Sequence, residues 1–306
     1  MDLRRSRGGS EYFRAHVLML AANRLFFDSS LATAGPRALN DLVRRMVLKE
    51  VLNCLAGRGI PVMPLKGALL AYTVYDDPRD RRVSDIDLLV PESAFEASIG
   101  ALAANGYQPM RQTQYHERML CASGVPIPID LHRTLFPRGR FRLSTKEIFA
   151  RGLQNTVLYG TSVVLPDPYD AYAHLIGHEA CHHRMPIDPR TSKDLFKLAS
   201  RHSLDSGQCA AHIDRVGLAR AARYALFDLS REDPFAFEVF EKLRHDSVGD
   251  FLASTARAWT MRFTQESIPS RVAGHMTNSS LLLAARAICE PIANRLNYWR
   301  AWRKLP

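Results

Sequence analysis

The stretch Val83-Ser-Asp-Ile-Asp-Leu-Leu-Val90 places two acidic residues in a segment that otherwise has the composition of a buried β-strand. Side chains in a strand alternate between its faces, so Asp85 and Asp87 are expected to point the same way. Two carboxylates held side by side repel each other unless a cation compensates them. Mg²⁺ is the natural cation, because it takes oxygen ligands from one or two carboxylates and from substrate phosphates. The pattern favours metal-assisted phosphoryl transfer, while a solvated strand edge or turn is the alternative for the Asp-x-Asp pattern alone.

A third carboxylate is expected on a neighbouring strand, and Asp130 in Ile127-Pro-Ile-Asp-Leu-His132 is the candidate. It too is flanked by apolar residues. The two prolines of the segment 125–132 predict an edge strand or an irregular strand, because proline cannot donate to a sheet ladder. His132 is placed near the same site, with a structural, hydrogen-bonded histidine as the alternative.

The rest of the chain predicts an α+β protein with a mixed sheet and flanking helices. Apolar residues at helical spacing indicate two or three helices between residues 11 and 55, with a break at Gly35-Pro36. Extended and helical patterns then alternate to about residue 165, and helices follow from Asp167 as an N-cap. We therefore expect an N-terminal helical segment (1–58), a mixed core (59–165) and a C-terminal helical domain (166–306).

The individual elements follow from local patterns. A helix is expected from Pro91 to a glycine stop at Asn105-Gly106, and a hairpin turn at 122–124. The remaining expectations are a short extended piece at 60–65, a helix at 66–75, a strand pair at 155–165 turning at Tyr159-Gly160, and helices at 169–183, 192–202 and 209–229.

The composition indicates a soluble, basic protein. The 306 residues include 41 Lys and Arg against 31 Asp and Glu, a net charge of +10 that favours phosphate-bearing or acidic partners or simply gives solubility. The five cysteines lie singly, as in a protein of the reducing cytoplasm. We expect no signal peptide and no membrane span, because the chain has no uninterrupted apolar run of sufficient length.

Several motifs in a fixed order carry a resemblance to a known family. They are Pro64-Leu-Lys-Gly67, Tyr75 with Asp77-Pro78, Arg81, the segment Ser84 to Pro91, Asn105-Gly-Tyr107 and Ile129-Asp-Leu-His132. The chain resembles nucleotidyltransferases of the DNA polymerase beta superfamily, and within it a poorly characterised bacterial branch. The similarity spans about residues 60–135 and continues weakly into the helical part.

The resemblance implies transfer of a nucleoside monophosphate from an NTP to an acceptor, with Mg²⁺ or Mn²⁺ as cofactor and release of pyrophosphate. Asp85, Asp87 and Asp130 would bind the metal, and Asp130 would help to activate the acceptor hydroxyl. The residues that would bind the nucleotide are Lys66, Gly67, Arg81 and Ser84. The superfamily usually has Gly-Ser or Gly-Gly at the helix start, whereas this chain has Gly67-Ala68 and lacks that hydroxyl. The acceptor stays open between a small molecule, a peptide or protein, and RNA.

A second motif predicts different chemistry. His178-Glu-Ala-Cys-His182 matches the helical zinc-protease signature, in which Glu179 would be the general base of a zinc-dependent hydrolase. Pro186 soon after the motif and the missing third ligand count against it. The other interpretations are a polar helix face, or a helix over the nucleotide site whose His178 and His182 contact phosphate or acceptor. A non-catalytic nucleotide- or peptide-binding module on the same fold is a further alternative.

The C-terminal segment Arg295-Leu-Asn-Tyr-Trp-Arg-Ala-Trp-Arg-Lys304 interleaves basic and aromatic residues. Such a segment can stack on nucleobases or lie against an anionic surface. Its aromatic side chains are equally suited to docking the last helix on the protein.

Overall fold

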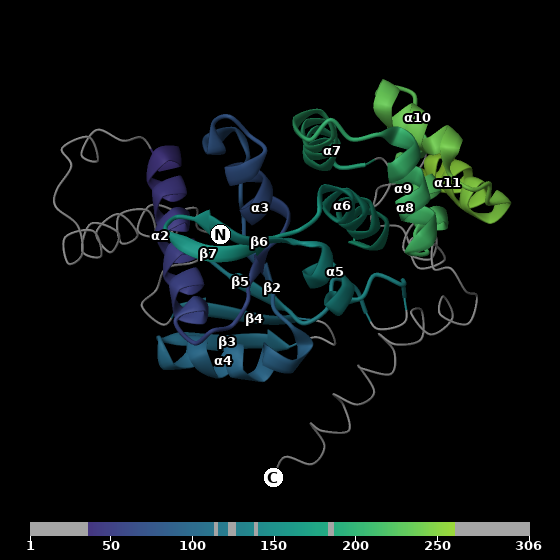
Figure 1. Cartoon of the computed structure of the whole chain (residues 1–306). Coiled ribbons are helices and arrows are strands. Elements are labelled where there is room, and N and C mark those ends of the chain that lie inside the picture. The colour runs from purple at the N-terminus through teal and green to yellow at the C-terminus, as the bar shows by residue number, and fades with distance from the viewer. Residues whose placement is uncertain (1–35, 113–115, 122–126, 138–139, 183–186, 261–306) are drawn as a thin grey trace, which may run out of the picture. The chain divides into compact units, whose positions relative to one another are not determined.

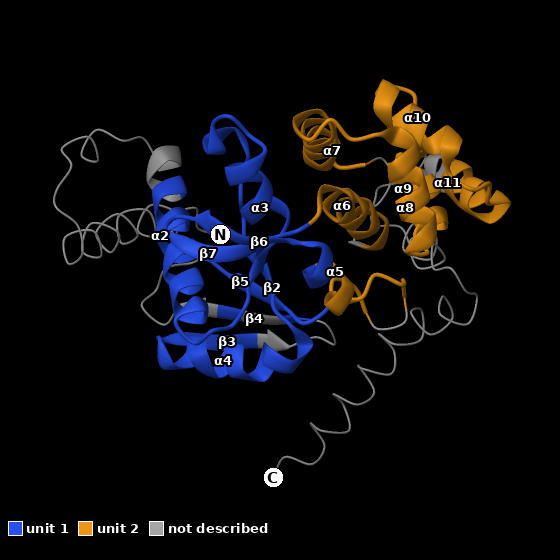
Figure 2. Cartoon of the chain, in the orientation of Figure 1, with its two compact units in different colours: residues 1–134, 149–166 blue, residues 135–148, 167–306 orange. Residues whose placement is uncertain are grey.

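The computed structural model describes residues 36–112, 116–121, 127–137, 140–182 and 187–260 (Figure 1). The chain divides into two compact units, unit 1 with residues 1–134 and 149–166, and unit 2 with residues 135–148 and 167–306 (Figure 2). The helices expected before residue 36, the turn at 122–124 and the basic aromatic segment 295–304 lie outside the described residues. The limits drawn from the sequence at 58 and 165 stay predictions.

Unit 1 is built on a five-stranded mixed sheet in the order β1-β2-β5-β4-β3. Its strands are β1 (Met63–Pro64), β2 (Ile86–Leu89), β3 (Tyr107–Gln112), β4 (His116–Cys121) and β5 (Ile129–His132). Strand β2 is antiparallel to β1 and parallel to β5, and β4 is antiparallel to both of its neighbours. A separate antiparallel pair consists of β6 (Leu153–Leu158) and β7 (Thr161–Leu165).

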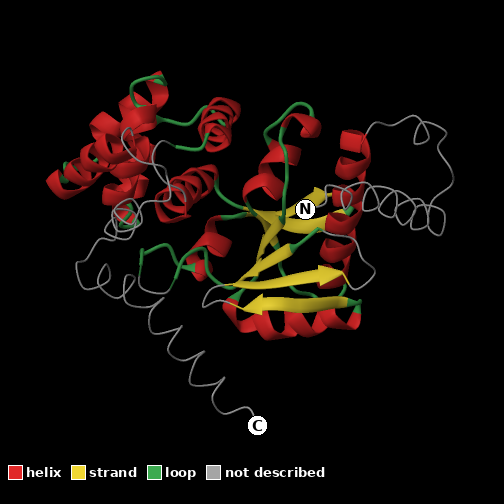
Figure 3. Ribbon diagram, turned by 180° about the vertical axis from the view of Figure 1, so that it is seen from behind, coloured by secondary structure: helices red, strands yellow, loops and turns green. Residues whose placement is uncertain are grey.

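In the described part of unit 1, three α-helices accompany this sheet. They are α2 (Pro36–Ala56), α3 (Lys66–Thr73) and α4 (Phe95–Ala104). Helix α4 packs along β3 and against α2, and α3 contacts β2 (Figure 3). Short 3-10 helices occupy Pro78–Asp80 and Glu92–Ala94. The core lies where the apolar face of α2 meets α4 and the strands, and its fully buried members include Leu48, Val51, Leu52, Leu55, Leu88, Leu102, Ile129 and Leu131.

The expected edge position of the segment around Asp130 is wrong, because β5 lies between β2 and β4 in the sheet. Pro128 comes just before the strand, so its missing N–H interrupts no ladder hydrogen bond of β5. Its carbonyl instead accepts a hydrogen bond from the Ile86 backbone N at 2.9 Å. The proline therefore helps to align β5 with β2.

In its described residues, unit 2 is helical apart from the segment before α5 (Thr145–Arg151), a helix that begins in unit 2 and ends in unit 1. Its helices are α6 (Pro168–His182), α7 (Pro189–Arg201), α8 (Ser206–Arg215), α9 (Ala219–Leu229), α10 (Pro234–Lys242) and α11 (Ser247–Thr260). The predicted N-cap Asp167 is confirmed, since its carboxylate accepts from the Tyr169 backbone N at 2.9 Å. The single segment expected at 209–229 is wrong. It is two helices separated at Gly217, whose φ of 75° a glycine adopts without strain.

The packing of unit 2 centres on α6 and α9. Helix α6 contacts α7, α8 and α9, while α9 also packs against α10 and α11. Arg220 and Arg223 of α9 form ion pairs with Asp246 and Asp250, which connect α9 to the last described helix. None of the helices within the described ranges combines the length and the apolar character needed to cross a bilayer.

Candidate active site

Strand pairing brings two of the predicted carboxylates together. In the parallel pair of β2 and β5, Asp87 is in direct register with Asp130. Neighbouring strands lie about 4.8 Å apart, so in-register side chains on one face are neighbours. Both aspartates are buried, with exposed fractions of 3% and 6%. The sheet therefore holds two carboxylates side by side in its centre.

Asp87 is compensated within the protein. Its Oδ1 lies 2.8 Å from Lys66 Nζ and 2.9 Å from His132 Nε2. Burial would raise the pKa of Asp87, but the charges and hydrogen bonds of Lys66 and His132 outweigh it and hold this pKa well below its usual range. The sequence predicted a cation for this carboxylate, and the cation that the structure places there is a lysine.

Asp85 lies just before β2, which begins at Ile86 rather than at Val83. Its Oδ1 accepts from the Ser84 hydroxyl at 2.8 Å. Burial, and then the charges of Asp87 and Asp130, raise the pKa of Asp85. The ion pair that the structure gives for Lys66 is with Asp87, at 2.8 Å.

Lys66 is positioned by an unusual backbone conformation at the start of α3. Its φ is 46°, in the left-handed region that residues with a Cβ seldom adopt. The preceding Leu65 hydrogen-bonds through its N to the Asp87 carbonyl at 3.0 Å, so the start of α3 is tied to the middle of β2. Leu65 is also the N-cap of α3, and its side chain makes no capping hydrogen bond to the first turn.

The other predicted nucleotide residues surround this helix start. A Cβ on Gly67 would lie 3.6 Å from Arg81 Nη1, so the Arg81 guanidinium covers the α-carbon of the glycine. Arg81 also donates to the Arg82 carbonyl. The Ser84 hydroxyl is directed to Asp85, as described above. Lys66 and Ser84 thus contact the carboxylates, while Arg81 lies beside Gly67 at the start of α3. The roles of all four residues in nucleotide binding stay predictions.

Two residues near the carboxylates were missed from the sequence. His116 of β4 is in register with His132 of β5, and their ring centroids are 5.1 Å apart. Burial, followed by the neighbouring His132, lowers the pKa of His116 to about 4. Arg44 of α2 lies close enough to Asp85 for their charges to interact. His116 begins a strand of mixed composition and Arg44 lies in a helix far upstream, so neither carried a local signal.

The carboxylates provide the donor type that Mg²⁺ or Mn²⁺ prefers, and Asp87 and Asp130 lie in register on adjacent strands. Within the described ranges, no three side chains of the His, Cys, Asp and Glu types are grouped as a ready metal site. The contact of Lys66 with Asp87 Oδ1 fits this observation. The residues fit a divalent ion in their chemistry, with Lys66 in contact with one of the oxygen atoms.

In helix α6, which carries the histidine motif, the glutamate of the motif makes structural hydrogen bonds. Glu179 is buried, and its two carboxylate oxygens accept from the Asp188 backbone N at 2.7 Å and from the Thr191 hydroxyl at 2.8 Å. These bonds tie α6 to the beginning of α7 and occupy the group that a zinc hydrolase needs as base. His174 is buried beside Phe136, with ring centroids 5.6 Å apart. The contacts expected of His178 and His182 with phosphate or acceptor stay predictions.

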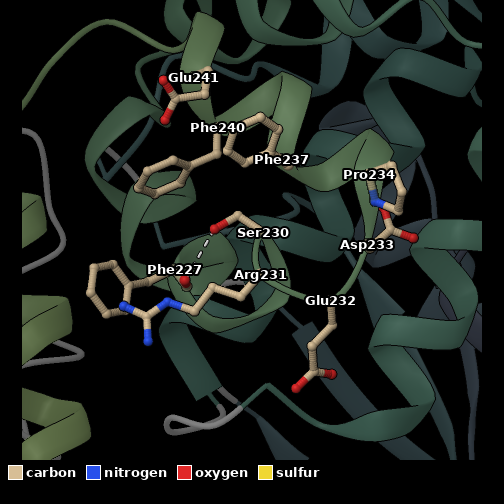
Figure 4. A pocket seen from close by; sticks show the side chains of 9 residues that line it. All are labelled: Phe227, Ser230, Arg231, Glu232, Asp233, Pro234, Phe237, Phe240 and Glu241. Atoms are coloured by element: carbon tan, nitrogen blue, oxygen red, sulfur yellow. Dashed lines mark hydrogen bonds between the residues drawn. The ribbon is translucent and has the colours of Figure 1, made fainter.

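A cavity of about 590 Å³ lies in unit 2, between the end of α9 and α10 (Figure 4). Phe227, Phe237 and Phe240 line it together with charged residues, and Arg231 lies over the Phe227 ring at 4.8 Å. None of the residues predicted from the sequence as site residues lines this cavity. The aspartates and the lysine described above all belong to unit 1.

The comparison with protein families defines the class of the chain. A family model of nucleotidyltransferases matches residues 37–229, from α2 to the end of α9. The chain belongs to this family, which is described as "Uncharacterised nucleotidyltransferase". The predicted family resemblance and the predicted α+β fold are therefore confirmed. No curated protein matches the chain in sequence.

Several solved structures are similar in fold. The antibiotic-resistance factor ANT(2'')-Ia is 14% identical with a TM-score of 0.43, and the match covers 63% of this chain and 98% of that one. An antigenic nucleotidyltransferase-like protein from Paracoccidioides brasiliensis is 14% identical with a TM-score of 0.41, over 68% and 96% of the two chains. The Megavirus polyadenylate synthase is 12% identical with a TM-score of 0.34, over 76% and 49%. Likenesses at this level define no substrate.

Proposed function

We propose that this nucleotidyltransferase moves a nucleoside monophosphate from an NTP to a hydroxyl-bearing acceptor, with Mg²⁺ or Mn²⁺ bound at the carboxylates. The observation that carries the proposal is the register of Asp87 with Asp130 on adjacent parallel strands, with Asp85 at the entrance to β2. Nucleotide transfer uses carboxylates of this kind to hold divalent ions, because the ions compensate the negative charge on the attacking and leaving oxygens.

The reaction forms one bond and breaks one. The acceptor oxygen bonds to the α-phosphorus of the NTP, the bond from that phosphorus to the bridging oxygen breaks, and pyrophosphate leaves with the electron pair. Asp130, at the centre of the sheet, takes the proton of the acceptor hydroxyl. Asp85 and Asp87 hold the divalent ion, which supplies Lewis-acid stabilisation of the phosphate oxygens when bound.

The start of α3 is the proposed binding site for the triphosphate. The first N–H groups of a helix have no partners within the helix, and Leu65 at the N-cap offers no side chain to them. Lys66, next to Gly67 in the chain, and Arg81, whose guanidinium lies beside the Gly67 α-carbon, add positive charge to this helix start. The net charge of +10 supports an acidic or phosphate-bearing acceptor such as RNA, with a peptide or small molecule as the other classes.

The test is transfer of label from each α-labelled NTP to components of a cell extract in the presence of Mg²⁺. Wild type is compared with Asp85→Asn/Asp87→Asn, which keeps the side-chain shapes and removes the charges. We expect the variant to lose at least about 100-fold in transfer rate, because metal binding fails.

The matched control is Asp76→Asn/Asp80→Asn, which removes two exposed carboxylates from the loop before β2. It should transfer label at the wild-type rate. Equal transfer by wild type and the Asp85/Asp87 variant, or an absence of NTP binding by the wild type, would sink the proposal.

A further inference from the structure

Lys66 and a metal ion require the same carboxylate. Lys66 Nζ is 2.8 Å from Asp87 Oδ1, and the exposed fractions of the two side chains are only 17% and 4%. A buried ammonium and a divalent ion in contact with one carboxylate oxygen repel each other, and little water is present to screen them. A divalent ion that binds to this oxygen of Asp87 therefore has to displace the Lys66 ammonium from it.

The backbone of Lys66 shows that this contact is imposed by the fold. A lysine at φ 46° is strained, and such residues persist where the surrounding structure determines their conformation. Leu65, immediately before it, is hydrogen-bonded to the carbonyl of Asp87 itself. The chain thus anchors Lys66 beside Asp87 through the backbone, while its long side chain keeps rotatable bonds that allow the ammonium to leave.

We propose that Lys66 is a displaceable counterion, which holds Asp87 until a divalent ion replaces it and then moves to the triphosphate of the NTP. This inference rests on the proposed function. Lys66 then positions the Asp87 carboxylate when no divalent ion is bound, and it binds the triphosphate when the ion and the NTP are bound. Lys66 directly precedes Gly67, whose α-carbon lies beside the Arg81 guanidinium, and the phosphates are proposed to bind at this helix start. Binding of the metal and binding of the nucleotide then favour each other. The metal frees the Lys66 ammonium to bind the triphosphate, and the triphosphate draws the ammonium away from the Asp87 oxygen that the metal needs.

The closing experiment measures Mn²⁺ binding without nucleotide, by electron paramagnetic resonance of the free ion. Lys66→Met keeps the apolar stem and removes the charge. We expect it to bind Mn²⁺ at least tenfold more tightly than wild type, and to show a smaller increase in Mn²⁺ affinity on addition of NTP, because only the phosphate ligands of the ion then contribute. Lys49→Met, at an exposed position of α2, should match wild type in both measurements. Unchanged or weaker Mn²⁺ binding by Lys66→Met would overturn the inference.

A second measurement uses the wild type, so it does not depend on a variant that folds. Acetic anhydride labelling, read by peptide mass spectrometry, reports the reactivity of each lysine. Saturating Mg²⁺ should raise the labelling rate of Lys66 at least threefold relative to Lys49. An unchanged ratio under saturating Mg²⁺ would contradict the displacement of Lys66.

The same titration separates this inference from the proposed function. If Asp85→Asn/Asp87→Asn binds Mn²⁺ as tightly as wild type, the proposed metal site is wrong. If that variant loses Mn²⁺ binding while Lys66→Met has the wild-type affinity, the metal site holds and only the role of Lys66 fails.

Discussion

At the scale of single residues, Lys66 combines a strained backbone with a buried ion pair. Its φ of 46° suits glycine, which has no Cβ to clash in the left-handed region. A lysine at this position therefore lowers the stability of the fold. The contact of its ammonium with Asp87 is the physical reason for a lysine here. A pair of substitutions can separate the backbone from the side chain.

Lys66→Gly and Lys66→Ala both remove the ammonium and differ only in the Cβ. We expect Lys66→Gly to be more stable than Lys66→Ala by about 1 kcal/mol, because glycine adopts the positive φ without strain. Urea denaturation measures the free energy of unfolding. At Lys49, inside α2, the order should reverse by a similar amount, since glycine is a poor helix former there. A less stable Lys66→Gly would show that φ at this position is not strained.

Part of the site could be predicted at this scale. The aspartates were identified because acids in apolar strands are conspicuous in a sequence, and the glycine and lysine of α3 because they belong to an ordered set of motifs. The contact of Lys66 with Asp87 was not predicted, since 21 positions separate the two residues and only the start of α3 against β2 brings them together. The same holds for His116, which reaches the site through the register of β4 with β5.

At the scale of elements, the patterns identified the strands and most helices, while their order in space depended on pairing. β5 is short and begins after Pro128, and the prolines of this segment predict an edge strand or an irregular strand. The pairing of β5 with both β2 and β4 gives it the central position, which local composition does not encode. The division of 209–229 into two helices has a local cause at Gly217, because its positive φ separates α8 from α9 although the apolar periodicity continues across it.

Helix α6 provides a prediction at this scale. A Cβ on Gly177 would lie 2.5 Å from Phe136 Cζ and 2.9 Å from Leu218 Cδ2, so Gly177→Ala requires the neighbouring side chains to move. We expect it to lower the free energy of unfolding by about 1 to 3 kcal/mol. Gly100 of α4 is exposed and a Cβ there meets nothing within 4 Å. Gly100→Ala should therefore raise stability by up to about 1 kcal/mol.

Thermal and urea unfolding of the two variants, followed by circular dichroism, test this difference. A Gly177→Ala protein as stable as wild type would mean that α6 and Phe136 are packed less closely than the structure shows. The close approach also explains why the histidine motif was ambiguous. The faces of α6 are used for packing at Gly177 and for tying α7 through Glu179, and neither use is visible in the His-Glu-x-x-His spacing.

At the scale of the whole molecule, the chain belongs to the nucleotidyltransferase family over residues 37–229. This range includes Asp85, Asp87 and Asp130 of unit 1 and the helices of unit 2 as far as α9. The family and the α+β class could be predicted from the sequence, because several motifs occur in a fixed order. The acceptor could not, since no motif in the chain identifies it. We propose that the transfer depends on the carboxylates of β2 and β5 together with a divalent ion.

The most direct test of this proposal is the rate at which labelled pyrophosphate is released from a γ-labelled NTP. The reaction contains Mg²⁺ and an extract that supplies the acceptor. Asp130→Asn should be at least about 100-fold slower than wild type, because the acceptor proton loses its base, while the exposed control Asp80→Asn should match wild type. Excess EDTA should stop the wild-type reaction, and added Mg²⁺ should restore it. A wild-type rate in Asp130→Asn, or a reaction that continues in EDTA, would contradict the account.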